Sequence, residues 1–452
     1  MRVFLIVLLS TLSNHASATV DPGPVPVPDP ARPKPYFSWD YIPLAFHGAN
    51  KTGMYNQETV EVLGKHYQMV TIEKWYTECG SAHPIQKGPW CNVEKAMYTT
   101  FNQLKAINPN ITNIMYLNSM MDFTMYNLHQ LAEDLEAKGT RVWLRDKNDK
   151  KVIYCNDGNY YCNVLNWDWT QQAARDLYTE HVRNATTQGG VDGIFADHAG
   201  TSLCHPKHNR YGPGTNNSIC NGADDKRVCY YFEPEFAAAF DIGHQWIINH
   251  TQNMLAPLGG PVIDGPYGKY QTHVCDFDSM RADVQKGQRG TGPYILEASL
   301  GGKGQLRGCT PDASCIASYL LNAVEYTYLG CLADEPQFLQ YPDLARPLGP
   351  PLGDATLEDG VWTRTFEKGA IARWYVNRTK GTMQWPGQPI PPVPPNMCPA
   401  AEQAFCPGKA HGGAKVSDPC YQCVANNSKA LASAGCWGGS TSRHDFIEVF
   451  CS

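Results

Sequence analysis

Short apolar runs alternate with segments of helical periodicity along most of the chain, and this alternation constrains the fold more than any other feature. Apolar residues recur at helical spacing over residues 124–138, 170–182 and 235–255, with Gly139 ending the first helix and Thr170 capping the second. The apolar runs, each short enough for a buried strand, are residues 42–48, 69–75, 113–119, 192–198, 261–266, 294–299, 326–333 and 370–376. Eight strands alternating with helices predict an α/β protein, a (β/α)8 barrel of the TIM type.

A doubly wound open sheet would give a similar alternation. Neither G-x-G-x-x-G nor G-x4-G-K-[ST] follows an early strand, so the sequence gives no support to nucleotide chemistry. Residues 141–156 interrupt the alternation with a pattern typical of a β-hairpin, turning around residues 146–150. We expect that hairpin at the rim of the barrel.

Two proline-rich segments, residues 19–35 and 385–396, mark where the barrel begins and ends. Proline excludes both helix interiors and central strands, so these segments are expected to be extended. The barrel is therefore predicted over residues 36–384, a usual size for this fold with insertions. Residues 397–452 form a separate C-terminal module.

The first 18 residues have the organisation of a secretory signal peptide. Arg2 supplies the positive charge, residues 3–12 form an apolar run, and small residues at Ala16 and Ala18 mark the cleavage site. The run is too short to span a bilayer, and no later segment has the apolar length of a membrane span. The 17 cysteines and seven N-x-Ser/Thr sequons agree with a secreted, disulfide-bonded glycoprotein.

The C-terminal module is predicted to be small, mainly helical and rich in disulfides. Its 56 residues build little core, so three disulfides are the expected means of stabilisation. Its cysteines are Cys398, Cys406, Cys420, Cys423, Cys436 and Cys451. A zinc site at the C-x-x-C of this set lacks a second such motif. Binding to polysaccharide and a purely stabilising role both stay open for the module.

The barrel itself holds eleven cysteines, an odd number. Cysteines close in sequence, such as Cys309 and Cys315, indicate local disulfides within loops. Cys331 lies in an apolar strand, where a thiol acts as a small hydrophobe, and is predicted to be the free one.

Net charge and motifs narrow the function classes. A formal net charge of -6 provides no basic surface for nucleic acid. No H-E-x-x-H metal motif and no G-x-S-x-G elbow is present, so neither a metal centre of that kind nor a serine hydrolase triad is favoured. We therefore expect no cofactor and no membrane span, and we expect a monomer.

Polar side chains are predicted to gather at the carboxyl ends of the strands, where barrels of this type hold their active sites. They are His47, Glu73, Asn118, Asp122, Asp197, His198, Asp264, Glu297, Asp334 and Glu335. A carboxylate after a buried run is costly unless it is solvated or hydrogen-bonded, so several at one rim indicate a polar pocket. Paired carboxylates are what glycosidic bond cleavage needs.

The segment Gly189–Gly200, GGVDGIFADHAG, carries the main resemblance to a known family. Together with residues 163–182 it resembles glycoside hydrolases with (β/α)8 barrels, in which an aspartate and a tryptophan precede a helix and a D-G-[IVF]-[FW]-x-D strand follows. Residues 362–377, WTRTFEKGAIARWYVN, are similar to the closing segment of such glycosidases. By order of elements, the resemblance extends over residues 36–384.

The resemblance implies roles for two carboxylates. In related retaining barrels the aspartate of the fourth strand is the nucleophile and the acid of the sixth is the general acid/base, which carries over to Asp197 and Glu297. Asp264 on the adjacent strand competes with Glu297 for the second role. Asp192 starts the same strand as Asp197, belongs to the opposite rim, and is predicted to be structural.

Sugar-binding side chains complete the predicted site. Aromatic rings pack against the apolar face of a pyranose, and carboxylates, amides and imidazoles bind its hydroxyls. The candidates are Glu73, Trp75, Asn118, His198, Asp264 and Tyr267. Trp143, Trp167 and Trp169 are at least as well explained as core residues. The predicted function is a secreted, retaining glycoside hydrolase acting on poly- or oligosaccharide, with a non-catalytic carbohydrate-binding barrel as the alternative and a structural matrix protein as a third class.

Overall fold

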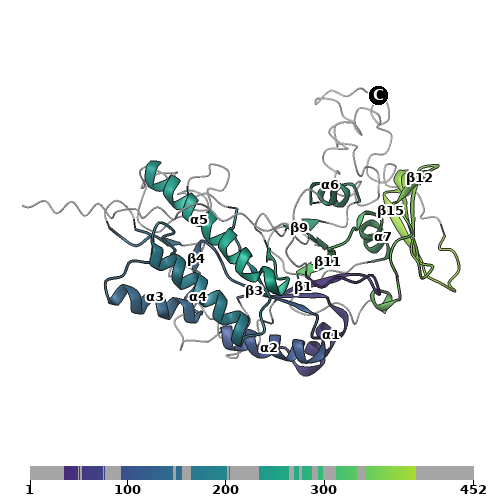
Figure 1. Ribbon diagram of the computed structural model, residues 1–452. Helices are drawn as coiled ribbons and strands as arrows, with labels where there is room; N and C mark the ends of the chain where they lie inside the picture. Colours follow the sequence, from purple (N-terminus) through teal and green to yellow (C-terminus); the bar gives the residue numbers. More distant parts are fainter. Residues whose placement is uncertain are drawn as a thin grey trace, which may run out of the picture.

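The computed structural model describes residues 35–48, 50, 53–74, 76, 93–145, 149–154, 164–200, 203, 234–263, 269–273, 277–287, 294–298, 312–332 and 342–392. Figure 1 shows a parallel sheet in the middle of the molecule, with helices around it and an antiparallel sheet at one end. The predicted signal peptide, the first proline-rich segment up to residue 34 and the cysteine-rich module lie outside the described residues.

Eight parallel strands form the central sheet in the order β8-β7-β3-β2-β1-β11-β10-β9. They are β1 (Leu44–Gly48), β2 (Met69–Ile72), β3 (Thr112–Tyr116), β7 (Gly193–Phe195), β8 (Val262–Ile263), β9 (Lys269–His273), β10 (Tyr294–Ala298) and β11 (Thr327–Leu332). Consecutive parallel strands are sheet neighbours except for β8 and β9, and β1 pairs with β11, as in a barrel opened along one seam. That seam lies between β8 and β9, and no described pairing joins those two strands. The parallel α/β sheet is confirmed, and its closure into a barrel stays a prediction.

Seven helices accompany these strands in the described part of the chain. They are α1 (Gln57–His66), α2 (Val93–Ile107), α3 (Asn127–Ala137), α4 (Gln172–Gln188), α5 (Pro234–Leu255), α6 (Phe277–Gly287) and α7 (Ala313–Asn322). Short 3-10 helices cover Ala256–Leu258, Pro342–Ala345 and Val376–Arg378. Among the described helices, none is long and apolar enough to cross a membrane.

The three predicted helices all form, with shifted ends. α5 matches its predicted range to one residue, and α3 begins three residues later than predicted and is followed by Gly139 at φ 83°. Thr170 does not cap α4. The N-cap is Gln171, because the Thr170 hydroxyl instead donates to Asp168 Oδ1 at 2.5 Å.

The last predicted barrel strand needs correction, and one parallel strand was not predicted. Residues 370–376 do not close the barrel; they contain β14, a strand of a separate antiparallel sheet. That sheet runs β12 (Thr356–Glu358), β13 (Val361–Thr365), β14 (Ile371–Tyr375) and β15 (Lys380–Gln384), and it packs on α7. The missing parallel strand is β9, whose KYQTH sequence is too polar to register as an apolar run.

The predicted hairpin is confirmed. Arg145 and Lys151 form an antiparallel bridge, and the Val152 N–H donates to the carbonyl of Leu144 at 2.9 Å. The chain continues into a three-stranded antiparallel sheet made of β4 (Met121–Asp122), β5 (Ile153–Tyr154) and β6 (Val164–Asn166).

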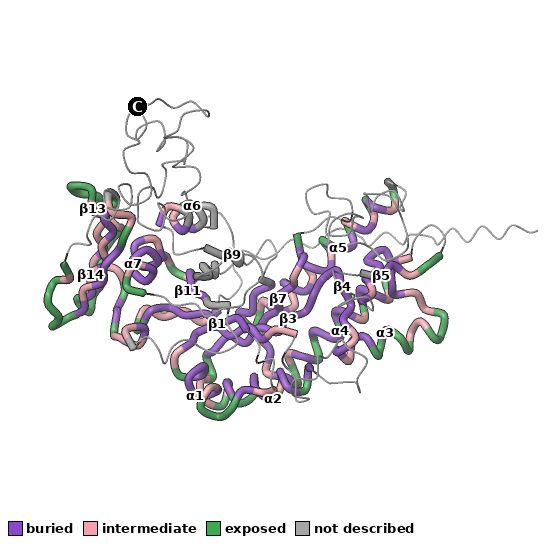
Figure 2. Tube along the Cα trace, turned by 180° about the vertical axis from the view of Figure 1, so that it is seen from behind, coloured by how far each residue is buried: buried purple, intermediate pink, exposed green. Residues whose placement is uncertain are grey.

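Buried residues follow β1, β2, β3 and β7 and parts of the helices that flank them (Figure 2). Trp143, Trp167 and Trp169 are all buried, so they belong to the core. Asp192 anchors the start of β7: its Oδ2 accepts the Asn113 N–H at 2.8 Å and pairs with Lys105 Nζ at 2.7 Å. This contact confirms the structural role predicted for Asp192.

Cys315 on α7 is disulfide-bonded. Cys331 lies in β11, opposite Phe46 of β1 in the sheet register. Whether its thiol is free stays a prediction, because its side chain is outside the described part.

Candidate active site

Asp197 lies just beyond the carboxyl end of β7, where its side chain is 29% exposed. The apolar strand GIF ends at Phe195, and two residues further the carboxylate emerges beside the neighbouring strand β3. The Tyr116 hydroxyl, at the end of β3, donates to Asp197 Oδ2 at 2.7 Å. The Asn118 amide donates to the same oxygen at 3.2 Å. No described contact holds Oδ1, so the described hydrogen bonds fix one of the two carboxylate oxygens.

The backbone of Asp197 is also held in place. Its carbonyl accepts hydrogen bonds from both the N–H and the hydroxyl of Ser119, each at 3.0 Å. His244 on α5 contacts the Ser119 hydroxyl at 2.9 Å, and the Trp169 indole donates to the Ser119 carbonyl at 2.8 Å. Because helix α5 and the buried indole of Trp169 share these contacts, the carboxylate is preorganised on rigid elements.

Asn118 is buried, and all of its amide is in use. Its Oδ1 accepts the N–H groups of Met120 and Met121 at 2.8 Å each, and its Nδ2 also reaches the Tyr116 hydroxyl at 3.2 Å. These bonds fix the orientation of the amide toward Asp197. The predicted contact of Asn118 with sugar stays a prediction, and the described contacts give the residue a positioning role.

Glu73 follows β2, and both of its oxygens are engaged. His47 Nε2 lies 2.9 Å from Oε1, and Lys74 Nζ donates to Oε2 at 2.9 Å. Burial raises the pKa of the Glu73 carboxyl, but the Lys74 ammonium and the His47 contact outweigh it and lower the pKa to about 2. A carboxylate with this pKa stays ionised at neutral pH, so Glu73 does not supply a proton to a leaving group.

Lys74 joins the two carboxylates into one cluster. Its ammonium lies 4.0 Å from the centroid of the Tyr116 ring, whose hydroxyl binds Asp197. Burial and the nearby charges of Asp197 and Glu73 raise the pKa of Tyr116 well above its ordinary value. The Tyr116 hydroxyl therefore remains protonated and acts as a permanent donor to Asp197. We call His47, Glu73, Lys74, Tyr116 and Asp197 the rim cluster.

Two other predicted rim residues differ in their surroundings. His198 has a left-handed backbone at φ 71° and places Nε2 3.8 Å from Asp197 Oδ2, yet it is nearly buried. Asp122 belongs to a separate network, in which its Oδ2 contacts His129 Nδ1 at 2.8 Å and accepts the Trp143 indole N–H at 2.7 Å. Burial raises the pKa of Asp122. Asp122 therefore binds α3 and the hairpin rather than a residue of the rim cluster.

Five candidates lie outside the described residues: Trp75, Asp264, Tyr267, Asp334 and Glu335. Glu297 lies in β10 opposite Gly330 of β11, but its side chain is not part of the described structure. β10 is the seventh parallel strand in chain order, not the sixth, because β9 precedes it. The argument that placed Glu297 on strand six is therefore wrong, although its position near a carboxyl end stands.

The sequence pattern missed several members of the site. Tyr116 looked like one more core residue of the run 113–119, although it precedes Asn118 by two and so points to the same face of the strand. His244 lies within an amphipathic helix, where nothing local distinguishes it from a core histidine.

No group of three His, Cys, Asp or Glu side chains that could hold a metal ion occurs among the described residues. The arrangement around Asp197 is suited to organic chemistry by a carboxylate, with fixed hydrogen-bond donors on one of its oxygens.

Comparison with known families places the chain among carbohydrate-active enzymes. The model of GHL15, described as "Hypothetical glycosyl hydrolase family 15", matches residues 105–370, more than half of the chain. The chain belongs to this family. The matched range includes Asp197 and Glu297 and ends within the antiparallel sheet. No curated protein matches.

Solved structures of glycosidases and a phosphorylase are distantly similar. They include the GH36 α-galactosidase AgaB of Geobacillus stearothermophilus, 11% identical with a TM-score of 0.41 over 81% of this chain and 51% of that one. They also include a sucrose 6F-phosphate phosphorylase of Thermoanaerobacter thermosaccharolyticum, 9% identical with a TM-score of 0.41 over 77% and 96%. The chain spans about half the length of the α-galactosidases that it matches. At these scores the structures bear on neither substrate nor site residues.

Proposed function

We propose that this protein is a secreted glycoside hydrolase that cleaves poly- or oligosaccharide by a retaining, two-carboxylate mechanism. Family membership supports the reaction class. The observation that carries the mechanism is the setting of Asp197, whose Oδ2 is held by Tyr116 and Asn118 while Oδ1 has no described contact.

Asp197 is the nucleophile in this mechanism. Its Oδ1 attacks the anomeric carbon as the glycosidic bond breaks, which gives a covalent glycosyl-enzyme. The two donors on Oδ2 fix the carboxylate plane, so the attacking oxygen needs no reorientation. Water then releases the sugar with its original anomeric configuration.

Glu297 is the proposed general acid and base. It protonates the leaving oxygen in the first step and takes a proton from water in the second. Its support is its place near the carboxyl end of β10 in the same parallel sheet as β7. Glu73 is no alternative acid, since its low pKa keeps it ionised.

Trp75, His198, Asp264 and Tyr267 are proposed to contact the sugar. Secretion after cleavage behind Ala18 and three disulfides in residues 397–452 belong to the same proposal. Sequencing the N-terminus of the exported protein, which should start at Thr19, tests the first point. Mass mapping of the peptides before and after reduction tests the second.

The decisive experiment screens the purified protein against a panel of polysaccharides, together with Asp197→Asn and Glu297→Gln. We expect a polysaccharide that the wild type cleaves, loss of nearly all activity in both variants, and a first product of retained configuration by proton NMR. Asp192→Asn is the matched control, because it changes the other aspartate of the same strand at the opposite end. It should lower stability but keep the chemistry.

Activity that survives Asp197→Asn would show that the nucleophile is misassigned. A product of inverted configuration would replace the retaining mechanism with an inverting one. Binding to a polysaccharide without any cleavage would favour the non-catalytic carbohydrate-binding barrel.

A further inference from the structure

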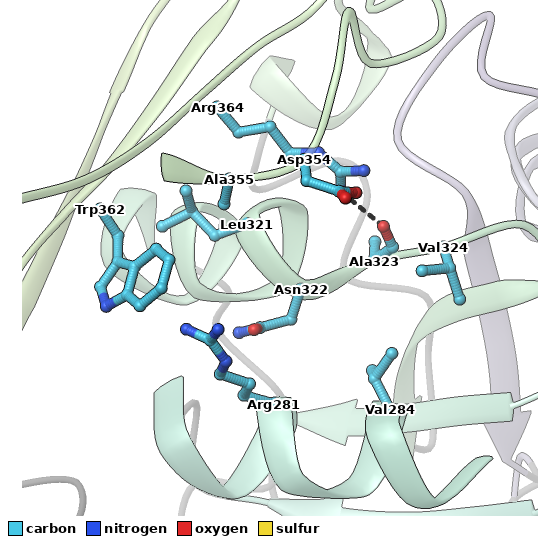
Figure 3. Close-up of a pocket in the computed structure, with 10 residues that line it drawn as sticks. All are labelled: Arg281, Val284, Leu321, Asn322, Ala323, Val324, Asp354, Ala355, Trp362 and Arg364. Carbon is cyan, nitrogen blue, oxygen red and sulfur yellow. Dashed lines mark hydrogen bonds between the residues drawn. The ribbon is translucent and has the colours of Figure 1, made fainter. Parts of the chain in front are cut away.

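A cavity of about 360 Å³ lies between α6, the end of α7 and the antiparallel sheet. Its lining includes Arg281 and Val284 from α6, Asn322 from α7, and Trp362 and Arg364 from β13 (Figure 3). The volume is in the range of small-molecule sites. The cavity takes no part in the site around Asp197.

The cavity is at the opposite edge of the sheet from Asp197. α7 ends at Asn322, and the cavity-lining residues Ala323 and Val324 lead into β11, which starts at Thr327. They therefore lie at the amino ends of the parallel strands, whereas Asp197 follows the carboxyl end of β7.

Arg364 and Arg281 have different surroundings within the cavity. The buried Arg364 guanidinium donates to the carbonyls of Leu320, Ala323 and Gly353, and Asp354 lies near enough to stabilise its charge. Its Nε and Nη1 are thus committed to backbone carbonyls. This cation holds the sheet against α7, and the ligand contacts argued here do not involve it.

Arg281 rises from α6 toward Trp362 and Asn322 (Figure 3). Its guanidinium lies over the Trp362 ring, 4.0 Å from the ring centroid, which orients the planar group by its face. Within the described part of the chain, no hydrogen bond or ion pair occupies its N–H edges. A stacked guanidinium with free edges is suited to bidentate recognition of a carboxylate.

The remaining walls favour a ligand with a ring and hydroxyl groups. Val284, Leu321, Val324 and Ala355 present aliphatic surface. Asn322 Nδ2 is held by the carbonyls of Phe277 at 3.2 Å and Ser318 at 2.9 Å, and no described hydrogen bond uses its Oδ1. That oxygen is available to accept a bond from a hydroxyl.

We propose that this cavity is a second ligand site, separate from the active site, that binds a small carboxylated sugar through Arg281. The carboxylate pairs with the guanidinium edge, the sugar ring packs against the aliphatic wall, and a hydroxyl donates to Asn322 Oδ1. The proposal does not rest on the hydrolase mechanism, because no residue of the rim cluster contributes to it.

The test is calorimetric titration of the full chain with D-glucuronate and with D-glucose, which differ only in the carboxylate. We expect glucuronate to bind, glucose not to bind, and Arg281→Gln to weaken glucuronate binding at least about tenfold. Ala355→Leu narrows the cavity without touching the guanidinium and should also weaken binding. Arg373→Gln, on the neighbouring strand β14 outside the cavity, is the matched control and should bind as the wild type does.

The same titration on Asp197→Asn separates the two sites. Unchanged glucuronate binding in that variant supports the cavity, whatever the outcome of the polysaccharide screen. Binding lost in Asp197→Asn but kept in Arg281→Gln would assign the ligand to the active site and overturn the proposal. Equal binding of glucose, or no binding of glucuronate to the wild type, would overturn it as well.

Discussion

Tyr116 and Asp197 show how single residues set the chemistry of this site. The tyrosine hydroxyl is buried and protonated, and it donates to Asp197 Oδ2, the oxygen that does not attack in the proposed mechanism. Hydrogen bonds to charged groups contribute about 1.5–3 kcal/mol each, so this contact is large enough to matter for rate.

Tyr116→Phe removes that hydroxyl and keeps the ring between Lys74 and Phe195. We expect kcat/KM on the polysaccharide found in the screen to fall about 10- to 100-fold, because the nucleophile loses its closest donor. Tyr178→Phe is the control: it is equally buried, but its hydroxyl reaches only a backbone carbonyl, that of Leu117, at 3.4 Å. Wild-type kcat/KM in a folded Tyr116→Phe would mean that Asp197 is positioned without it.

Glu73 provides a pH-dependent contribution to stability. Its pKa falls from an ordinary 4.5 to about 2 in the folded chain, so the folded state favours the ionised form. The stabilisation is complete above about pH 4.5 and is lost as pH falls toward 2. The shift corresponds to about 3 kcal/mol at neutral pH.

Glu73→Gln tests this linkage by urea unfolding at pH 6, 4.5 and 3. We expect the wild type to be more stable at pH 6 and the difference to shrink at each lower pH. Glu61→Gln removes the carboxylate of an exposed pair with Lys65 and should show no comparable pH dependence. A wild-type advantage that stays constant down to pH 3 would contradict the low pKa of Glu73.

Sequence patterns at the residue scale singled out Asp197 and Glu73 together with Asn118 and His47, which contact them, but not Tyr116 or His244. A carboxylate after an apolar run is visible locally, because burial of a charge needs a reason. Tyr116 and His244 reach the site from other elements, so no local pattern marks them. The sequence could assign Asp192 and Asp197 to opposite edges of the sheet, because they lie at the two ends of the same strand.

At the scale of elements, close approach of β7 and β8 depends on glycine. A Cβ atom on Gly260 would stand 1.6 Å from the backbone carbonyl oxygen of Asp192, and backbone on both sides leaves little room to relax. The Ile194 N–H donates to the carbonyl of Pro261 at 3.0 Å between the same two strands. Position 260, just before β8, therefore requires a residue without a side chain.

Gly260→Ala should lower the free energy of unfolding by at least about 2 kcal/mol, because the strands must separate to admit the methyl group. Gly353→Ala is the control, since a Cβ there meets nothing within 4 Å, and it should change stability by less than about 0.5 kcal/mol. Thermal unfolding of both variants checks the difference. Equal midpoints would contradict the tight approach of the two strands.

Elements with strong patterns were predictable, and those with weak ones were not. The apolar periodicity of α5 gave its range to one residue, whereas Thr170 lost the capping role because Asp168 binds its hydroxyl. β9 was missed since its sequence KYQTH has no apolar run. Missing one strand shifted Glu297 from strand seven to strand six.

On the scale of the whole molecule, the parallel sheet follows from the alternation of strands and helices, and the antiparallel sheet does not. β14 has the alternating burial of a half-buried strand, and local sequence does not say which sheet such a strand joins. What assigns it to the second sheet is pairing with β13 and β15, both close in sequence. Contacts of that sheet with α7 then fix its place in the molecule.

Arg364 links the antiparallel sheet to α7 by hydrogen bonds. It reaches from β13 to the carbonyls of Leu320 and Ala323 at the end of α7, which would otherwise lack partners as helix termini do. Arg364→Gln leaves these buried carbonyls without their donor. We expect a loss of about 2–4 kcal/mol in stability and faster hydrogen exchange in β12 to β15.

Arg373→Gln, on the next strand, removes a guanidinium that binds only Gln384 Oε1 in the described structure, at 2.9 Å. Exchange in β12 to β15 should then be close to that of the wild type. If both variants speed hydrogen exchange in β12 to β15 equally, the exchange reports the stability of the sheet itself and not its attachment through Arg364. If neither does, apolar packing of β14 and β15 on α7 is sufficient, because burial is then the larger contribution at this interface.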